Sequence, residues 1–115
     1  MKNLIKSILV IILIAFQTSC KSVDISPKEG VIKVPPKGEL RMWQNLEHSS
    51  FSLHLENNSV KNSCEAYKVN SIGNEKWISP SLLASKTLDF TIPSDGSLLL
   101  KNFSDEELTI NYKIN

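Results

Sequence analysis

Residues able to carry chemistry are scarce in this sequence. Its 115 residues include two cysteines and two histidines, and neither a Gly-x-Ser-x-Gly elbow nor a His-x-x-x-His spacing accompanies them. The 13 basic and 12 acidic residues give a net charge of +1, without the basic excess typical of nucleic-acid-binding domains. We therefore expect no enzymatic activity, no cofactor and no nucleic-acid partner.

The few candidate groups do not form a familiar site. Met42, His48, His54 and Cys64 supply the ligand types of a cupredoxin-type copper site, but there a His and a Met follow the Cys, and none follows Cys64. His54 lies between two leucines, so it is expected on the solvent side of a strand. Cys64 precedes an acidic residue that would raise the pKa of its thiol, and we expect it to fill a small space in the core. We therefore expect no metal site and no catalytic residue.

The N-terminal residues combine two lysines with an unbroken apolar run. Lys2 and Lys6 precede the run 8–16. A transmembrane helix needs about 20 residues to cross a hydrocarbon core of about 30 Å, so this run is too short and predicts the apolar region of a secretory signal peptide. Thr18 and Ser19 then supply the small residues typical of a cleavage site.

Cys20 follows directly, and here the segment resembles the signal peptide of bacterial lipoproteins, whose Cys after the cleavage site becomes the first mature residue and is lipidated. It departs from that family at Gln17, where an aliphatic residue is usual. The resemblance implies a signal peptide over 1–19 and a diacylglyceryl anchor on Cys20, and two acyl chains hold a protein stably at a membrane. Lys21 follows Cys20 in place of the Asp that favours inner-membrane retention, which implies the outer membrane of the cell envelope.

Two alternatives to lipidation stay open: an uncleaved N-terminal anchor, and a secreted protein whose Cys20 is free or bridged to Cys64. In the lipidated form Cys64 is the remaining thiol, so the domain cannot contain a disulfide framework and must depend on a packed core. Removing Lys2 and Lys6 with the signal peptide leaves 11 basic and 12 acidic residues, which again argues against nucleic acid.

The mature chain is long enough for one domain and too short for two. Residues 20–39 are predicted to hold the lipidated Cys and a Pro- and Gly-containing stretch, which is either a tether or an edge strand with its loops. The composition of 31–34 favours a short strand. A tether of this kind would hold the domain some tens of Å from the membrane. Residues 40–115 are predicted to form the domain itself.

Apolar and polar residues alternate through much of 40–115. The alternation covers 51–56, 87–92 and 108–114, and turn signals rich in Asn, Gly, Pro and Asp separate these segments. One face of each strand is therefore expected in a core and the other in water. We predict an all-β fold, a small antiparallel β-sandwich of immunoglobulin-like or related Greek-key topology with about seven strands.

Two segments depart from this alternation. Leu98–Leu100 has no polar position, which predicts a central strand covered on both sides. Ser79–Ser85 places a Ser before Pro80, a combination that favours the start of a helical turn.

The sequence also contains a weak internal repeat, which we call the echo. Residues 52–69 and 97–114 align without gaps at an offset of 45 and share a Ser, two Leu, an Asn, a second Ser, a Tyr and a Lys. If the echo is structural, each half is a strand, an Asn-x-Ser turn and a second strand, with Tyr67 and Tyr112 at equivalent places. Convergence of two hairpins under the same constraints is the alternative, and two units are too few for a solenoid.

Aromatic residues offer the remaining candidates for a binding face. Trp43 is expected in the core, and a core position is also the first expectation for Trp77. If Trp77 is exposed instead, Trp77, Tyr67 and His54 are the candidates for a binding face. We predict a lipid-anchored, non-enzymatic module that binds another envelope protein. The alternative is a carbohydrate-binding module that stacks these aromatics on a sugar ring.

Overall fold

The computed structural model describes residue 25 and residues 27–115. They form eight β-strands: β1 (Glu29–Val34), β2 (Gly38–Met42), β3 (Phe51–Asn57), β4 (Glu65–Val69), β5 (Glu75–Trp77), β6 (Thr87–Ile92), β7 (Ser97–Asn102) and β8 (Leu108–Ile114). Among these residues no helix has the length and apolarity needed to cross a membrane.

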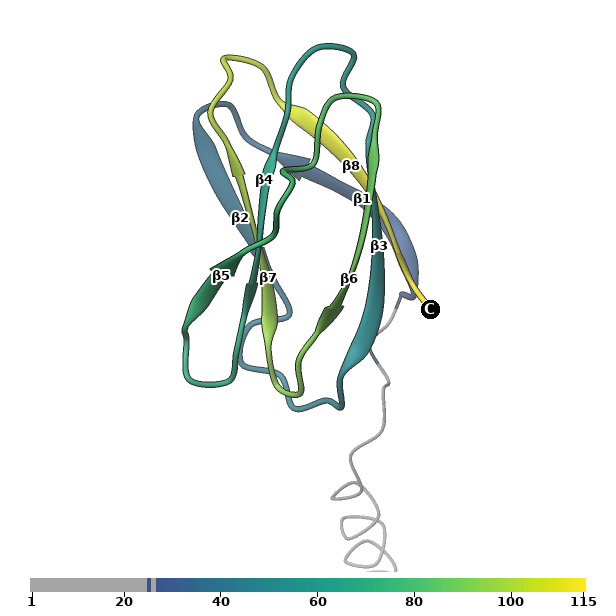
Figure 1. Ribbon diagram of the computed structural model, residues 1–115, viewed down its shortest axis with the longest axis vertical. Helices are drawn as coiled ribbons and strands as arrows, with labels where there is room; N and C mark the ends of the chain where they lie inside the picture. Colours follow the sequence, from purple (N-terminus) through teal and green to yellow (C-terminus); the bar gives the residue numbers. More distant parts are fainter. Residues whose placement is uncertain (1–24, 26) are drawn as a thin grey trace, which may run out of the picture.

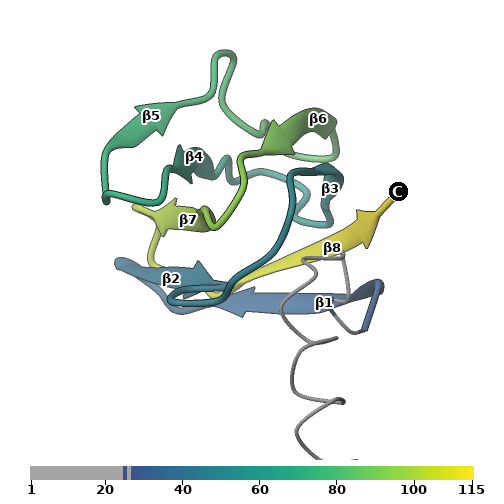
Figure 2. The same cartoon turned by 90° about the horizontal axis from the view of Figure 1, so that it is seen from below.

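The strands form two four-stranded antiparallel sheets with the orders β1-β8-β3-β6 and β2-β7-β4-β5. Figure 2 shows the two sheets as separate layers facing each other. The predicted all-β antiparallel sandwich is therefore confirmed. Consecutive strands mostly lie in different sheets, and this order is that of an eight-stranded jelly roll, a double Greek key.

Strict alternation builds the core between the sheets. Every second residue of β3 and of β8 is buried, including Leu53, Leu55 and Ile110 at 0% exposure. β7, which lies between β2 and β4, differs because its outward-facing residue Leu99 is buried as well. Leu98, Leu99 and Leu100 are all 0% exposed, which confirms that this strand is covered on both sides.

The loops gather at two ends of the sandwich (Figure 1). At one end, which we call the entry end, the chain enters β1 and the connections 43–50, 70–74 and 93–96 join the strands. The opposite end, which we call the far end, carries the connections 35–37, 58–64, 78–86 and 103–107.

Residues 27–39 belong to the sandwich. Val31–Val34 lies within β1, an edge strand of its sheet, and Gly38 begins β2, an edge strand of the other. Ile25 also packs into the core, at 7% exposure. The range 20–39 therefore supplies edge strands and a turn in its described part, and any tether must lie before residue 25.

The predicted helical turn over Ser79–Ser85 is wrong. This segment forms an irregular loop that contains a cis Ser79–Pro80 peptide bond. Leu82 makes an isolated antiparallel bridge with Cys64, and the two residues exchange backbone hydrogen bonds of 2.8 and 2.9 Å. Pairing with Cys64 thus takes the backbone groups that a helical turn would need.

The internal echo corresponds to a pseudo-twofold axis of the sandwich. Exchanging β1 with β5, β2 with β6, β3 with β7 and β4 with β8 converts the order of one sheet into that of the other. The echo is therefore structural for the first strand of each half.

The second strand of each half is shifted by one residue. Leu55 of β3 lies opposite Tyr112, whereas its counterpart Leu100 of β7 lies opposite Ala66. The gapless alignment predicted that Tyr67 and Tyr112 are equivalent, and this is wrong. Because side chains alternate with period two, the slip turns Tyr112 into the core and leaves Tyr67 on the outer surface.

Candidate functional site

One row of side chains crosses the outer surface of the β2-β7-β4-β5 sheet. Register places Arg41 beside Leu99, Leu99 beside Tyr67, and Tyr67 beside Trp77. Cross-strand neighbours share a face, and these residues alternate with the core residues of their strands, so all four side chains point away from the core. We call this surface the aromatic face.

A strap of two charged side chains crosses the aromatic face. Arg41 on β2 and Glu75 on β5 lie on opposite edge strands, and their Nη2 and Oε2 atoms are 2.9 Å apart. The pair therefore spans β7 and β4. Leu99 lies beside Arg41 and Val69 beside Glu75 in the register, and they are 0% and 5% exposed although they face outward. This burial is what an arginine stem laid over apolar surface, with its head group kept polar, would produce. Glu75, with a lesser contribution from Glu39, raises the pKa of Arg41.

Tyr67 is fixed at the centre of this face. Its hydroxyl donates a hydrogen bond to a carboxylate oxygen of Glu65, two residues earlier on β4. Lys101 Nζ lies 4.8 Å from the centre of the ring, within cation–π range. The hydrogen bond to Glu65, reinforced by partial desolvation and by the charges of Glu65 and Glu75, raises the pKa of Tyr67 to about 12. Tyr67 is thus a fixed, neutral aromatic group.

Trp77 is the open part of the aromatic face. It ends the short edge strand β5 and is 48% exposed. Its pairing with Tyr67 places two aromatic side chains on adjacent strands, with the charges of Glu65, Lys101 and the strap around them. Such a surface offers a large apolar contact with hydrogen-bonding groups at its margin.

His54 lies on the other sheet, away from Tyr67 and Trp77. It belongs to β3 and alternates with buried Leu53 and Leu55, so it faces outward from the β1-β8-β3-β6 sheet. The two sheets face each other across the core, and their outer surfaces point in opposite directions. The three predicted residues therefore do not form one face, because sequence alternation gives inside or outside but not the sheet.

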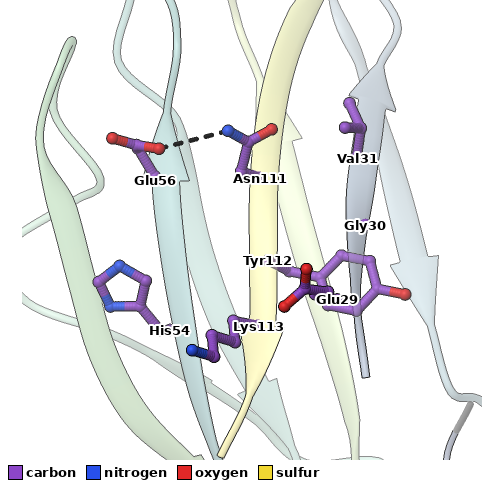
Figure 3. A pocket seen from close by; sticks show the side chains of 8 residues that line it. All are labelled: Glu29, Gly30, Val31, His54, Glu56, Asn111, Tyr112 and Lys113. Atoms are coloured by element: carbon purple, nitrogen blue, oxygen red, sulfur yellow. Dashed lines mark hydrogen bonds between the residues drawn. The ribbon is translucent and has the colours of Figure 1, made fainter. Parts of the chain in front are cut away.

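His54 borders a shallow hollow of about 400 Å³ on its own sheet (Figure 3). The register places Glu29, Lys113, His54 and Asp89 in one row across four strands. His54 Nδ1 is 2.7 Å from Asp89 Oδ1. Lys113 and His54 occupy the middle of the row, and the carboxylates of Glu29 and Asp89 close it at its two ends.

A second polar row limits the same hollow. Asn111 Nδ2 donates to Glu56 Oε1 at 3.3 Å (Figure 3). Val31 lies beside Asn111 in the register and is 59% exposed. The hollow is therefore a mixed surface with an apolar rim rather than a site of one charge.

The candidate metal ligands of the sequence are spread over the molecule. His48 is in the loop 43–50 at the entry end, whereas Cys64 immediately precedes β4 at the far end, and Met42 packs against the core. In the part of the chain that the structure describes, no three His, Cys, Asp or Glu side chains are placed to hold a metal ion. The ring nitrogens of His48 are instead 2.8 Å from the carbonyl oxygens of Ser49 and Gly96.

Cys64 is a core residue, at 1% exposure. Burial raises the pKa of its thiol to about 12, and the charge of Glu65 adds to this effect while a backbone hydrogen bond from Lys101 opposes it. The thiolate required of a nucleophile is thereby disfavoured.

Trp43 packs against the core at the entry end. Its ring meets those of Phe51 and Tyr112 edge to face, with centroids 5.3 and 5.6 Å away. These contacts confirm the expected structural role of Trp43, and they leave Trp77 as the more accessible indole.

The charged partners of the aromatic face were missed by sequence reasoning. Arg41 and Glu75 are 34 residues apart, and Lys101 meets Tyr67 across a strand pairing. The alternation visible in 38–42 places Arg41 on an outer face, but nothing local indicates which strands flank it. The predicted lipid attachment site, Cys20, lies outside the described residues.

No family model and no curated protein sequence matches this chain. Solved structures share its fold at 12% identity. A crystal structure of PirA matches with a TM-score of 0.57, over 79% of this chain and 96% of PirA. Drosophila melanogaster CENP-C bound to CAL1 matches with a TM-score of 0.53, over 80% of this chain and 64% of that one.

The CENP-C cupin domain by itself matches with a TM-score of 0.51, over 82% of this chain and 65% of that one. This chain thus spans less than two thirds of the CENP-C chains. At such identity the likeness shows the fold alone, which is a cupin-like β-sandwich.

Proposed function

We propose that this chain is a lipid-anchored, non-enzymatic binding module of the bacterial cell envelope. Cys20 carries the lipid, the outer membrane holds the anchor, and the aromatic face binds another envelope protein. The exposed pairing of Trp77 with Tyr67 beside the Arg41–Glu75 strap is the observation that carries this proposal.

The composition of the aromatic face supports a protein partner. Tryptophan, tyrosine and arginine are the residues most enriched at the energetic centres of protein interfaces. Here they lie in one row, and Tyr67 and Arg41 are held by Glu65 and Glu75. A partner would meet side chains that are already ordered, which lowers the entropy lost on binding.

The structural likeness supports the same class of function in a general way. The structure of CENP-C with CAL1 is a complex between two proteins, so one protein of related fold is known with a protein partner. A cupin-like sandwich supports many functions, and the proposal for this chain therefore rests on its own surface.

The side chains most suited to catalysis have other roles, which supports a non-enzymatic module. The Cys64 thiol is buried, and its raised pKa disfavours the thiolate. His48 is 1% exposed, and both of its ring nitrogens face carbonyl oxygens. His54 is bound to Asp89 on an open sheet surface.

Site-specific photocross-linking in living cells tests the partner-binding face. A photoreactive amino acid at position 77 should capture a discrete protein adduct, while the same group at Thr91, an exposed position of β6 on the other sheet, should not. Trp77→Ala should abolish capture from a probe at Glu39, an exposed position on the same face of β2 as Arg41, whereas Leu83→Ala, which removes a side chain of similar exposure (49%), should leave it intact. Equal adducts at 77 and 91, or none at 77, would contradict the proposal.

Metabolic labelling with a fatty-acid probe tests the anchor separately. The wild-type chain should incorporate the probe and Cys20→Ser should not. An unlabelled wild-type chain would leave the aromatic face as a proposal and remove the membrane anchor.

A glycan is the second candidate ligand, and the exposed indole of Trp77 favours it. An aromatic ring beside hydrogen-bonding carboxylate and ammonium groups suits the apolar face and the hydroxyls of a sugar. Titration with cell-wall and plant-type polysaccharides should change tryptophan emission in the wild type and not in Trp77→Phe. A flat response across the panel would exclude this candidate.

A further inference from the structure

Two neighbouring loops at the entry end carry exposed aliphatic side chains. Leu46, in the connection 43–50, is 47% exposed, and Ile72, in the connection 70–74, is 79% exposed. Both connections line the same hollow of about 520 Å³ and therefore lie side by side. Two aliphatic groups are thus presented to the surroundings at one end of the sandwich.

The tip that carries Ile72 is held by hydrogen bonds within its own turn. Asn70 Oδ1 accepts hydrogen bonds from the backbone N–H groups of Ile72 and Asn74, at 3.1 and 2.9 Å. Gly73 has a φ of 90°, which a side chain would disfavour, and its N–H donates to the Asn70 carbonyl at 3.0 Å. The turn therefore points Ile72 outward in a fixed geometry.

The loop that carries Leu46 is braced on both sides. Trp43 anchors its start against Phe51 and Tyr112. Near its end, His48 is buried, and its backbone N–H donates to Asp95 Oδ1 at 2.9 Å. Leu46 lies between these two fixed points and remains exposed, so its exposure does not result from a loose loop.

The described chain begins at the same end of the sandwich. Ile25 packs in the core, the Tyr112 hydroxyl donates to the Pro27 carbonyl at 3.1 Å, and Ile114 N–H donates to the Lys28 carbonyl at 2.6 Å. Cys20 precedes Ile25 by five residues, and five extended residues reach about 18 Å at most. A lipid on Cys20 would therefore hold Ile25, and with it the start of β1, within about 18 Å of the bilayer.

We propose that Leu46 and Ile72 enter the interfacial layer of the membrane that holds the lipid anchor, so that the domain stands on its entry end. This inference rests on the acylation of Cys20 proposed above. The transfer of aliphatic side chains from water to the boundary between head groups and acyl chains lowers the free energy. With the entry end at the membrane, the aromatic face points sideways and the far end points away.

Polarity-sensitive fluorophores test this orientation on the full, acylated chain in phosphatidylethanolamine–phosphatidylglycerol vesicles. Leu46→Cys and Ile72→Cys receive the dye, and Val60→Cys, 89% exposed in a loop of the far end, is the matched control. Cys20 is blocked by its acyl chain and Cys64 is buried, so the introduced thiol is the labelled one. Unchanged urea midpoints verify that the variants fold.

We expect a blue shift at positions 46 and 72 when the vesicles are present, with loss of most of the emission to quenchers carried on the lipids, and neither effect at position 60. Emission at 46 and 72 that stays equal to that at 60, in protein that floats with the vesicles, would overturn the inference and leave the anchor intact. Protein that carries no acyl chain and does not float would overturn the anchor as well. A shift that appears only at high protein density would mean that these side chains meet a second copy, and would also overturn the inference.

Discussion

Asn57 and Asn102 occupy equivalent positions in the two halves of the sandwich and perform the same task. Each ends a strand, is 1% exposed, and accepts through Oδ1 a hydrogen bond of 2.9 Å from the backbone N–H two residues later. Asn57 Nδ2 donates to carbonyls of its own loop and of the loop between β5 and β6. Asn102 Nδ2 donates to the Glu106 carbonyl of its own loop and to the carbonyls of Val34 and Pro35, where β1 ends.

Replacing either asparagine should therefore loosen the far end. We expect Asn102→Ala or Asn57→Ala to lower the free energy of unfolding by about 2–4 kcal/mol, since each leaves buried carbonyls without donors. Asn102→Asp should also destabilise although it is isosteric, because a carboxylate oxygen would face the carbonyls of Val34, Pro35 and Glu106. Urea titration measures these changes, with exposed Asn58→Ala as a control within about 0.5 kcal/mol of wild type.

Arg41 should stabilise the domain more through the apolar cover that its aliphatic stem provides than through its ion pair with Glu75. Arg41→Ala uncovers Leu99 and should cost about 1 kcal/mol, whereas Arg41→Met keeps the apolar cover and should cost less than about 0.5 kcal/mol. Lys33→Ala is the control, because its 3.8 Å pair with Glu107 is exposed and should contribute nothing measurable. Equal losses for Arg41→Ala and Arg41→Met in urea titration would assign the effect to the ion pair instead.

The Cys64 thiol should not react in the folded protein. Its pKa is raised to about 12 by burial, so at neutral pH the reactive thiolate is almost absent. In a chain whose Cys20 is acylated or replaced by Ser, a thiol reagent should modify Cys64 in urea and not in buffer. Ser63→Cys, at the exposed position next to it in a Cys64→Ser background, should react in both. Rapid labelling of native Cys64 would contradict the buried state.

Stability should fall in strongly alkaline solution because of Tyr67. Its pKa is raised to about 12 by the hydrogen bond to Glu65, against about 10 in the unfolded chain. Between these two pKa values the folded state holds a proton that the unfolded state has lost. The stabilisation of the folded state by protonated Tyr67 is therefore complete below pH 10 and disappears as the pH rises through about 12.

The difference between wild type and Tyr67→Phe isolates this contribution. Subtracting the tyrosinate absorbance of Tyr67→Phe from that of the wild type gives the titration of Tyr67, which we expect near pH 12. In Glu65→Gln the titration of Tyr67 should move toward the ordinary tyrosine range. An unchanged titration in Glu65→Gln would show that Glu65 is not the cause.

Much of the fold could be predicted because alternation reports directly on burial. The patterns at 51–56, 87–92 and 108–114 became β3, β6 and β8, and the apolar Leu98–Leu100 became the covered strand β7. β5 gave no such signal, since all three of its residues are exposed. The helical turn predicted from Pro80 failed because pairing between Leu82 and Cys64 decides that loop.

The candidate site was harder to predict than the strands. Trp77 and Tyr67 were chosen for their chemistry, and the register places them side by side. His54 was chosen on the same grounds and lies on the other sheet, because neighbouring strands of a jelly roll come from distant parts of the chain. Arg41, Glu75 and Lys101 join the face through strand pairings, which leave no mark in the local sequence.

An all-β body with one central covered strand could be predicted from the amino-acid sequence, which also predicts the route of export and the anchor on Cys20. These properties follow from local composition and period, which act over a few residues. Tertiary packing was needed to establish which strands share a sheet, that Tyr67 faces outward while Tyr112 faces inward, and that Leu46 and Ile72 lie at the end where the chain enters β1. A shift of one residue in register exchanges the two faces of a strand, and register is set by packing between segments far apart in the chain.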